Sequence, residues 1–297
     1  MTQALFMDTG TASLNPSLDH LRDWIGRTEQ RDDIVTAAPL AGLSATLDRA
    51  DDPAPIAGTP LPPLAHWLYF LPQAPAREIG TDGHPRRGGF LPPVPLLRRM
   101  WAGGRLTFAH ALHVGEAITR RSTILRVDAK PGRSGALVFV TVRHEIVNAQ
   151  GAAVTEEHDI VYRDNPAPGA VPPAPQPAPA DEAFSREITP DPVLLFRYSA
   201  LTFNGHRIHY DRTYVTEVEG YPGLIVHGPL IATLLADLLR REMPRAVLKQ
   251  FDFKAASPLF DIHPFSVCGR RDADGSVALW ARNHLGQLAM SARAVLA

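Results

Sequence analysis

Residues 165–180, NPAPGAVPPAPQPAPA, consist almost entirely of proline, alanine and glycine. Proline lacks a backbone N–H and fixes φ, so neither a helix nor a central strand can run through this stretch. The composition instead predicts an extended, semi-rigid connector. It divides the chain of 297 residues into an N-terminal half at 1–163, a linker at 164–182 and a C-terminal half at 183–297.

Each half is predicted to combine a helix with an antiparallel meander. Alternating apolar residues between glycine-containing turns predict four strands in each half. They are Arg105–His113, Ala117–Val127, Ala136–Asn148 and Ala153–Arg163, then Lys249–Ala255, Pro264–Asp272, Val277–Asn283 and Leu288–Leu296. Helical spacing of apolar residues predicts helices at Ser17–Arg27 and Ala37–Leu47, and a third that starts at Pro229 with Gly228 as its N-cap.

Other segments have less regular patterns. The aromatic run at Leu64–Leu71 predicts a buried strand, and a further strand is expected to end near Phe203. Thr28–Ile34 is charged and is expected to be solvated. The stretch Ile79–Gly104 is dense in glycine, proline and arginine, which predicts a long ordered loop of the kind that often carries function.

Bulk properties exclude several classes of protein. A net charge of -1 and a pI near 6.9 argue against nucleic acid as a partner. The chain has one cysteine, Cys268, which rules out an internal disulfide framework and fits a reducing compartment, where it is expected to be buried in a strand. No signal peptide and no apolar run long enough for a membrane span are evident, so we expect a soluble, cytoplasmic protein.

A dense polar group precedes the third helix. Asn204, His206, His209 and Asp211 lie just before the step Val226-His227-Gly228-Pro229. Histidine is suited to moving a proton near neutral pH, and a helix N-terminus offers unpaired N–H groups to a developing oxyanion. Asparagine both donates and accepts hydrogen bonds, which suits orienting a water molecule. The pattern therefore favours acid–base chemistry beside an oxyanion site.

Alternatives remain for the same residues. His209 alone would fit a buried histidine that hydrogen-bonds the backbone. His206 and His209, with Asp211 or His227, offer metal ligands, but their spacing matches no zinc signature, and we expect no metal. A serine hydrolase is disfavoured because the chain has no G-x-S-x-G motif.

The segments NGHRIHYD and GLIVHGPL resemble the signature of the MaoC-like, or hydratase 2, branch of the hot dog superfamily. Together with RYSALTF and EGYP beside them, and with GGFLPPVPLLRRMWAGG upstream, they resemble the fused subgroup of mesaconyl-C4-CoA (3-methylfumaryl-CoA) hydratases, itaconyl-CoA hydratases and mitochondrial hydroxyacyl-thioester dehydratases. The resemblance implies an α+β double hot dog fold, with two antiparallel sheets each wrapped around a central helix. It also implies a catalytic C-terminal half, an N-terminal half that shapes the acyl pocket, and no cofactor besides the CoA thioester substrate.

Placed on this chain, the resemblance puts the catalytic histidine on His209. It puts the glycine whose N–H polarises the thioester carbonyl on Gly228. Asn204 and His206 stand where the wider family has aspartate and asparagine, and Arg207 stands in place of its proline. We expect Asn204 and His206 to position the attacking water or to share its proton.

These residues predict reversible addition of water across the 2,3 double bond of an enoyl-CoA, with a C4–C5 dicarboxylyl-CoA such as mesaconyl-C4-CoA or itaconyl-CoA as the substrate. The candidates for substrate binding are Arg98, Arg99, Arg86, His227 and Tyr221, of which the arginines suit a carboxylate or the CoA phosphates. The alternatives are a 3-hydroxyacyl-thioester dehydratase of fatty acid metabolism, an acyl-CoA thioesterase and a non-catalytic binding module. A thioesterase of this fold normally uses a carboxylate along the central helix, and none occurs between Pro229 and Ala236. A homodimer is possible.

Overall fold

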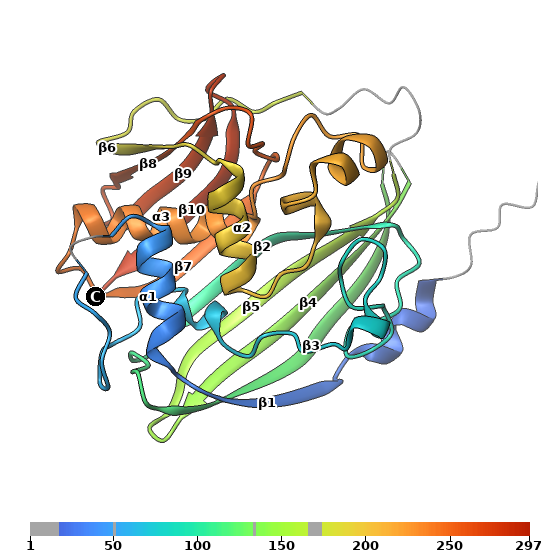
Figure 1. Ribbon diagram of the computed structural model, residues 1–297, viewed down its shortest axis with the longest axis horizontal. Helices are drawn as coiled ribbons and strands as arrows, with labels where there is room; N and C mark the ends of the chain where they lie inside the picture. Colours follow the sequence, from blue (N-terminus) through green and yellow to red (C-terminus); the bar gives the residue numbers. More distant parts are fainter. Residues whose placement is uncertain (1–17, 50–51, 133–134, 166–173) are drawn as a thin grey trace, which may run out of the picture.

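Ten strands form one antiparallel sheet in the computed structural model, which describes residues 18–49, 52–132, 135–165 and 174–297 (Figure 1). The sheet order is β1-β3-β4-β5-β2-β7-β10-β9-β8-β6. The strands are β1 Thr28–Ile34, β2 Arg98–Phe108, β3 Ala117–Gly132, β4 Gly135–Asn148, β5 Gly151–Arg163, β6 Phe184–Ile188, β7 Leu248–Ala255, β8 Phe265–Arg271, β9 Val277–Asn283 and β10 Leu288–Leu296.

The two halves of the chain meet where β2 pairs with β7. Gly103 lies opposite Lys254 and Gly104 opposite Phe253. A Cβ atom on Gly103 would lie 2.5 Å from the Phe253 carbonyl oxygen, so only glycine permits this approach. The two predicted meanders are thereby joined edge to edge into a single sheet.

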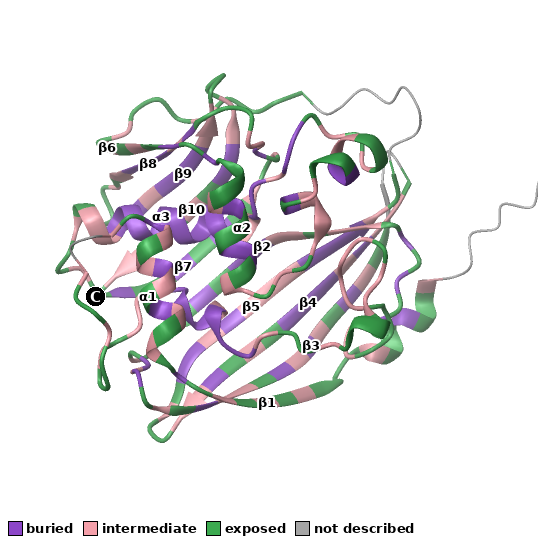
Figure 2. Cartoon of the chain, viewed as in Figure 1, coloured by how far each residue is buried: buried purple, intermediate pink, exposed green. Residues whose placement is uncertain are grey.

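The core of the C-terminal half is the helix α3, Gly228–Glu242, which the sheet strands β8, β9 and β10 contact. Every residue from Leu230 to Leu239 is buried, as Figure 2 shows along the helix. A helix buried on all sides needs a mostly apolar sequence, and the leucine-rich sequence of α3 meets this requirement. The helix predicted to start at Pro229 is confirmed, with His227 rather than Gly228 as the N-cap.

Two shorter helices lie in front of the sheet in Figure 1. They are α1, Ala37–Thr46, and α2, Pro192–Leu201, and they pack against each other. A Cβ atom on Gly42 of α1 would lie 2.8 Å from the Leu201 side chain, so the small residue allows close contact. The predicted helix at Ala37–Leu47 is confirmed.

Several predicted elements were wrong in type. Leu64–Leu71 contains a short 3-10 helix, Ala65–Leu68, rather than a strand, because Leu64 adopts a left-handed φ of 69° that breaks an extended backbone. The strand expected to end near Phe203 is α2. Thr28–Ile34, for which only solvation was expected, is the edge strand β1 with alternating exposed residues, and Leu18–Trp24 is a 3-10 helix. The loop beginning at Ile79 ends where β2 begins, at Arg98.

The remaining predictions of local structure have mixed outcomes. Cys268 is buried in β8, as predicted. Residues 166–173 of the predicted linker lie outside the described residues. The later part of the linker bonds to the start of β10, where Leu288 N–H donates to Gln176 O at 2.8 Å. No helix in the described chain is long and apolar enough to cross a membrane.

Candidate active site

The polar group predicted from sequence lies between the end of α2 and the start of α3. Asp191 caps α2 by accepting the Leu194 N–H at 2.8 Å, and Pro192 occupies its first turn. After the helix ends, Phe203 takes a left-handed φ of 49° and turns the chain. A short 3-10 helix, Arg207–His209, then turns the His209 side chain inward.

His209 is held in one tautomer. Its Nδ1 lies 2.7 Å from the carbonyl oxygen of Ile225, which only accepts hydrogen bonds, so Nδ1 carries the hydrogen and Nε2 keeps a lone pair. Ile225 is itself fixed, because its N–H donates to Ile208 O at 3.0 Å. Burial lowers the pKa of His209 to about 4, so the ring is a neutral base at pH 7.

His209 lies against the N-terminus of α3. Its ring stacks on that of His227 with centroids 3.7 Å apart, and His227 is the residue just before Gly228. His227 is fully buried and bonds Ser199 Oγ through Nε2 at 2.8 Å. A Cβ atom on Gly228 would meet no atom within 4 Å, so open space lies beside this residue. The imidazole and the helix N-terminus therefore share one locality.

Asn204 and His206 also lie close to His209. Asn204 Oδ1 accepts the backbone N–H of His206 at 3.0 Å, so the NH₂ group of Asn204 is left to face other groups. The ring of His206 lies edge-on to that of His209, with centroids 5.5 Å apart. Burial and neighbouring histidines lower the pKa of His206 to about 2, so it too is neutral.

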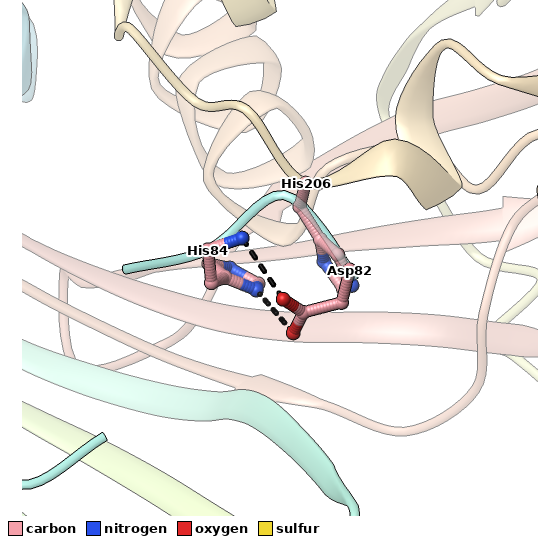
Figure 3. A group of neighbouring side chains, drawn as sticks. All are labelled: Asp82, His84 and His206. Carbon is pink, nitrogen blue, oxygen red and sulfur yellow. Dashed lines mark hydrogen bonds and ion pairs between the residues drawn. The ribbon is translucent and has the colours of Figure 1, made fainter. Parts of the chain in front are cut away.

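A loop from the N-terminal half reaches this group. His84 lies against His206, with ring centroids 4.0 Å apart, and bonds Asp82 through both its backbone N–H and its Nδ1 (Figure 3). The loop is fastened to the C-terminal half because Arg207 N–H donates to Asp82 O at 2.9 Å. We call His84, His206, His209 and His227 the His209 cluster.

A cavity of about 820 Å³ opens beside the His209 cluster. Its lining includes Asn204, Ser199, Pro229 and His84. Tyr210 also lines the cavity, so His209 and Gly228 are each the chain neighbour of a lining residue, Tyr210 and Pro229 respectively. Apolar residues of the loop before β2 also line the cavity, together with the exposed Phe196 of α2 and the exposed Phe203 just after that helix. These dimensions suit an acyl thioester rather than a single small ion.

A second polar group lines the same cavity from the N-terminal half. Glu156 is buried and accepts hydrogen bonds from His66 Nε2 at 3.1 Å and from Trp67 Nε1 at 3.0 Å. His144 bonds Ser122, and His158 stacks on Trp101 with centroids 3.9 Å apart. We call these the Glu156 cluster, consisting of His66, His144, Glu156 and His158.

Comparison with known proteins decides the family. A family model described as hydroxyacyl-thioester dehydratase type 2 matches residues 64–261, which include both clusters. The chain belongs to this family. It is also 49% identical over 272 residues to the mesaconyl-C(4)-CoA hydratase of Chloroflexus aurantiacus, covering 91% of this chain and 95% of that protein. It is 30% identical to the mitochondrial hydroxyacyl-thioester dehydratase type 2 of Schizosaccharomyces pombe, covering 80% and 88%.

Solved structures agree on the fold. A MaoC-like dehydratase from Phytophthora capsici matches with a TM-score of 0.67 at 14% identity, covering 95% of this chain and 99% of that one. HtdX of Mycobacterium tuberculosis matches with a TM-score of 0.62 at 16% identity, covering 90% and 98%. The predicted double hot dog fold is thereby confirmed for this family member.

The predicted arginines occupy different surroundings. Arg98 already has partners within the protein. Its guanidinium donates a hydrogen bond to Tyr221 Oη at 2.5 Å and lies 3.7 Å from the Glu219 carboxylate. Arg86 and Arg99 line a smaller cavity of about 190 Å³ that shares His84 and Pro85 with the larger one. The charge of Arg99 contributes to the lowered pKa values of His84 and His206, so it lies near both rings. Within the described chain, the half-buried Arg99 forms no ion pair, and its guanidinium lies within hydrogen-bonding reach of Tyr162.

The metal alternative involves only one of the residues considered in the sequence, His206. Asp211 bonds Arg207 Nη2 at 2.8 Å, and His209 Nδ1 and His227 Nε2 are both engaged. Ligand atoms of Asp82, His84 and His206 do lie within 4.8 Å of one another. In this structure Asp82 accepts two hydrogen bonds from His84 instead.

Sequence reasoning missed Asp82 and His84. Their signal was the step Asp82-Gly83-His84 inside the Gly/Pro/Arg-rich loop, where an acid stands two residues before a histidine. The Glu156 cluster was also missed, because its members are spread over β4, β5 and a 3-10 helix and do not form a motif.

Proposed function

We propose that this protein adds water reversibly across the 2,3 double bond of an enoyl-CoA. The observation that carries the proposal is the stacking of His209 on His227 at the N-terminus of α3. A neutral base and an oxyanion site are thereby brought to one place beside an acyl-sized cavity. Membership of a dehydratase family supports the same chemistry in the reverse direction.

The mechanism follows from the tautomer of His209. As the water oxygen bonds to C3, one of its protons passes to His209 Nε2, and negative charge moves to the thioester oxygen. The N–H of Gly228 at the start of α3 stabilises that oxygen, and loss of one such donor in other enzymes costs about 3 kcal/mol. The imidazolium of His209 then returns the proton to C2, which leaves the enzyme unchanged.

We further propose a C4–C5 dicarboxylyl-CoA, such as mesaconyl-C4-CoA or itaconyl-CoA, as the substrate. The relative of 49% identity carries the name mesaconyl-C(4)-CoA hydratase. Arg99 supports this choice, because a substrate carboxylate would give this cation an opposite charge in the smaller cavity, which shares His84 with the larger one. The cytoplasm is the proposed compartment, because a chain with a single cysteine fits a reducing environment.

A second candidate is a 3-hydroxyacyl-thioester dehydratase of longer chains. The cavity of about 820 Å³ and its exposed apolar mouth at Phe196 and Phe203 favour this candidate. A thioesterase is less well supported. The buried acid of α3, Asp237, pairs with Arg49, Arg186 and Arg241 at 2.8, 3.3 and 2.7 Å and is not available to activate water.

Turnover of crotonyl-CoA, mesaconyl-C4-CoA and itaconyl-CoA, measured side by side, tests the proposal. We expect loss of enoyl absorbance without release of free thiol, and the highest kcat/KM for a dicarboxylyl substrate. Arg99→Gln should lower kcat/KM for that substrate by about 10- to 100-fold and leave crotonyl-CoA much less affected, because only the former loses a charge-assisted hydrogen bond. Thiol release, or equal effects on both substrates, would contradict it.

A further inference from the structure

The cavity of about 820 Å³ has an exposed end and a buried end. Phe196 and Phe203 line it and are each 61% exposed, and Tyr210 beside them is exposed as well. Glu156 also lines the cavity but is only 2% exposed, and His66 next to it is buried. A ligand that enters from solvent therefore passes the aromatic side chains, and its innermost atoms approach the Glu156 cluster.

The position of the reacting groups sets the direction of a bound acyl chain. Tyr210 at the exposed end is the chain neighbour of His209. The charged phosphates of CoA favour water, so CoA extends outward from a thioester held at His209 and Gly228. The acyl carbons beyond C3 then extend inward. This step rests on the proposed function, which places the thioester at those two residues.

The buried end of the cavity is a polar surface on one face of the sheet. Ser122 of β3 pairs with His144 of β4, and His144 pairs with Glu156 of β5, so the three residues stand side by side. His158 follows two positions along β5 and faces the same side. The Glu156 cluster is therefore a continuous surface rather than one isolated side chain.

Charges and polar atoms without protein partners cover this surface. Glu156 is ionised, because the hydrogen bond from His66 and nearby histidines lower its pKa to about 2. Arg120 lines the cavity near this carboxylate, and its Nε is buried without a hydrogen-bond partner in the described chain. His158 is neutral, since burial lowers its pKa to about 4, and it stacks on Trp101 without a hydrogen bond to any described residue. Water or a polar group of a ligand is needed to satisfy these atoms.

Such a surface is unfavourable for an alkyl chain. A methylene group that contacts it removes water from the carboxylate, the guanidinium and the imidazole, and it supplies no hydrogen bond in return. The free energy lost in this way exceeds the gain from burying a few methylene groups.

We propose that the Glu156 cluster determines the acyl specificity of the enzyme. The cluster admits acyl groups that are short or that end in a polar group, and it excludes long alkyl chains. A four- or five-carbon acyl group leaves water on the cluster, whereas a chain of eight or more carbons displaces it. Of the two candidate substrate classes, the inference favours the dicarboxylyl-CoA over the longer-chain acyl thioester.

Binding of saturated acyl-CoAs, which cannot be hydrated, tests the inference apart from the reaction. Isothermal titration calorimetry of the wild type should give a Kd for octanoyl-CoA about 10- to 100-fold higher than that for butyryl-CoA, because polar groups of the cluster lose their water. An apolar cavity gives the reverse order, since each added methylene group tightens binding. Octanoyl-CoA that binds as tightly as butyryl-CoA, or more tightly, overturns the inference.

His158→Leu is the sharpest variant, because it breaks no hydrogen bond to a described residue and replaces the imidazole by an apolar group. It should lower the Kd for octanoyl-CoA about 10-fold and change that for butyryl-CoA less than about threefold.

Glu156→Gln is the second variant. Oε2 of Glu156 accepts the hydrogen bonds of both His66 and Trp67, at 3.1 and 3.0 Å, and the amide oxygen of glutamine keeps both when it takes that place. The variant removes the charge and should shift the ratio of the two Kd values in the same direction. A merely structural role would weaken the binding of both ligands equally.

The same strand supplies a matched control. Thr155 precedes Glu156 in β5, so its side chain faces the opposite side of the sheet, and it lines neither cavity. Thr155→Val makes a polar-to-apolar change there and should keep the wild-type ratio of the two Kd values. An equal shift in the control, or an unchanged ratio in both folded variants of the cluster, overturns the inference.

The outcomes separate the two proposals. A wild type that hydrates no enoyl-CoA but binds butyryl-CoA more tightly than octanoyl-CoA overturns the proposed function alone. A wild type that hydrates crotonyl-CoA and 2-octenoyl-CoA with equal kcat/KM supports the proposed function and overturns the role of the Glu156 cluster.

Discussion

One histidine-rich cluster lines the cavity and another lies beside it, and the two differ in what their ring nitrogens do. The Glu156 cluster lies mainly on strands around a buried carboxylate, which holds His66 and Trp67 through hydrogen bonds. The His209 cluster lies on loops and the cap of α3, and hydrogen bonds at Nδ1 of His84 and of His209 leave Nε2 of each ring as a base. The presence of histidines therefore does not by itself indicate acid–base chemistry. The tautomer of each ring and the presence of a helix terminus beside it are better indicators.

The electrostatics of the two clusters also differ. Burial would raise the pKa of Glu156, but the bond from His66 and nearby histidines lower it to about 2, so the carboxylate is ionised, with the Arg120 cation lining the same cavity. The His209 cluster itself holds neutral rings beside the positive end of a helix. The helix terminus stabilises an enolate, whereas at the Glu156 cluster the opposite charges of Glu156 and Arg120 lie close together.

Removing one ring from each cluster should give the largest contrast. His209→Ala removes the base, and we expect kcat for the enoyl-CoA to fall about 10³-fold or more. His158→Ala removes a ring that stacks on Trp101 in the Glu156 cluster and should act mainly on KM, with kcat within about tenfold. Steady-state kinetics of both variants measures the two effects, and circular dichroism checks that each variant is folded. A larger kcat effect at 158 than at 209 would reverse the assignment of the two clusters.

Deleting the N–H of Gly228 tests the oxyanion site. Gly228 is the first residue of α3 and a Cβ atom there meets nothing within 4 Å, so proline is tolerated sterically. Gly228→Pro should lower kcat/KM about 10²- to 10³-fold, because the donor to the enolate is lost.

Gly228→Ala is the matched variant, since it adds the Cβ atom but keeps the N–H. It should retain most of the activity. Equal losses in the two variants would mean that the backbone donor at 228 has no part in the reaction.

The pH dependence should show the smallest effect. Burial lowers the pKa of His209 to about 4, and the base works in its neutral form. Activity should therefore persist as pH falls through 6.5, the usual pKa of histidine, and be lost only nearer pH 4. The free energy of unfolding should also fall as the pH is lowered. His144 and His158 have pKa values lowered by burial to about 3 and 4, so the unfolded chain binds more protons below pH 6.5 and folding weakens there.

Initial rates of kcat/KM against pH check this expectation, with folding followed at each pH. An acid limb centred near pH 6.5 in a chain that is still folded would show that the base is a solvated imidazole.

The sequence predicted the meanders and α3 well, because alternation and a leucine stripe are local signals. It failed for α2, where the run before Phe203 looked extended and the decisive feature was the cap of Asp191 and Pro192. It failed for β1 because an edge strand of charged residues resembles a solvated loop until its partner β3 is known.

The site was predictable only in part. His209 and Gly228 fall in two neighbouring segments, and the structure stacks His209 on His227, the residue just before Gly228. Asp82 and His84 lie over a hundred residues upstream, and their approach depends on the crossing of Gly83 and Gly205. A contact between two glycines in separate halves leaves no periodicity that one sequence reveals.

The proposed hydration requires that His209 Nε2 and Gly228 N–H both face the same thioester. A crystal structure of His209→Ala with bound enoyl-CoA tests this directly, because the variant binds the substrate without consuming it. We expect the thioester oxygen about 3 Å from Gly228 N and C3 beside the vacated position of the imidazole. A thioester bound against the Glu156 cluster, with Gly228 N–H directed elsewhere, would contradict it.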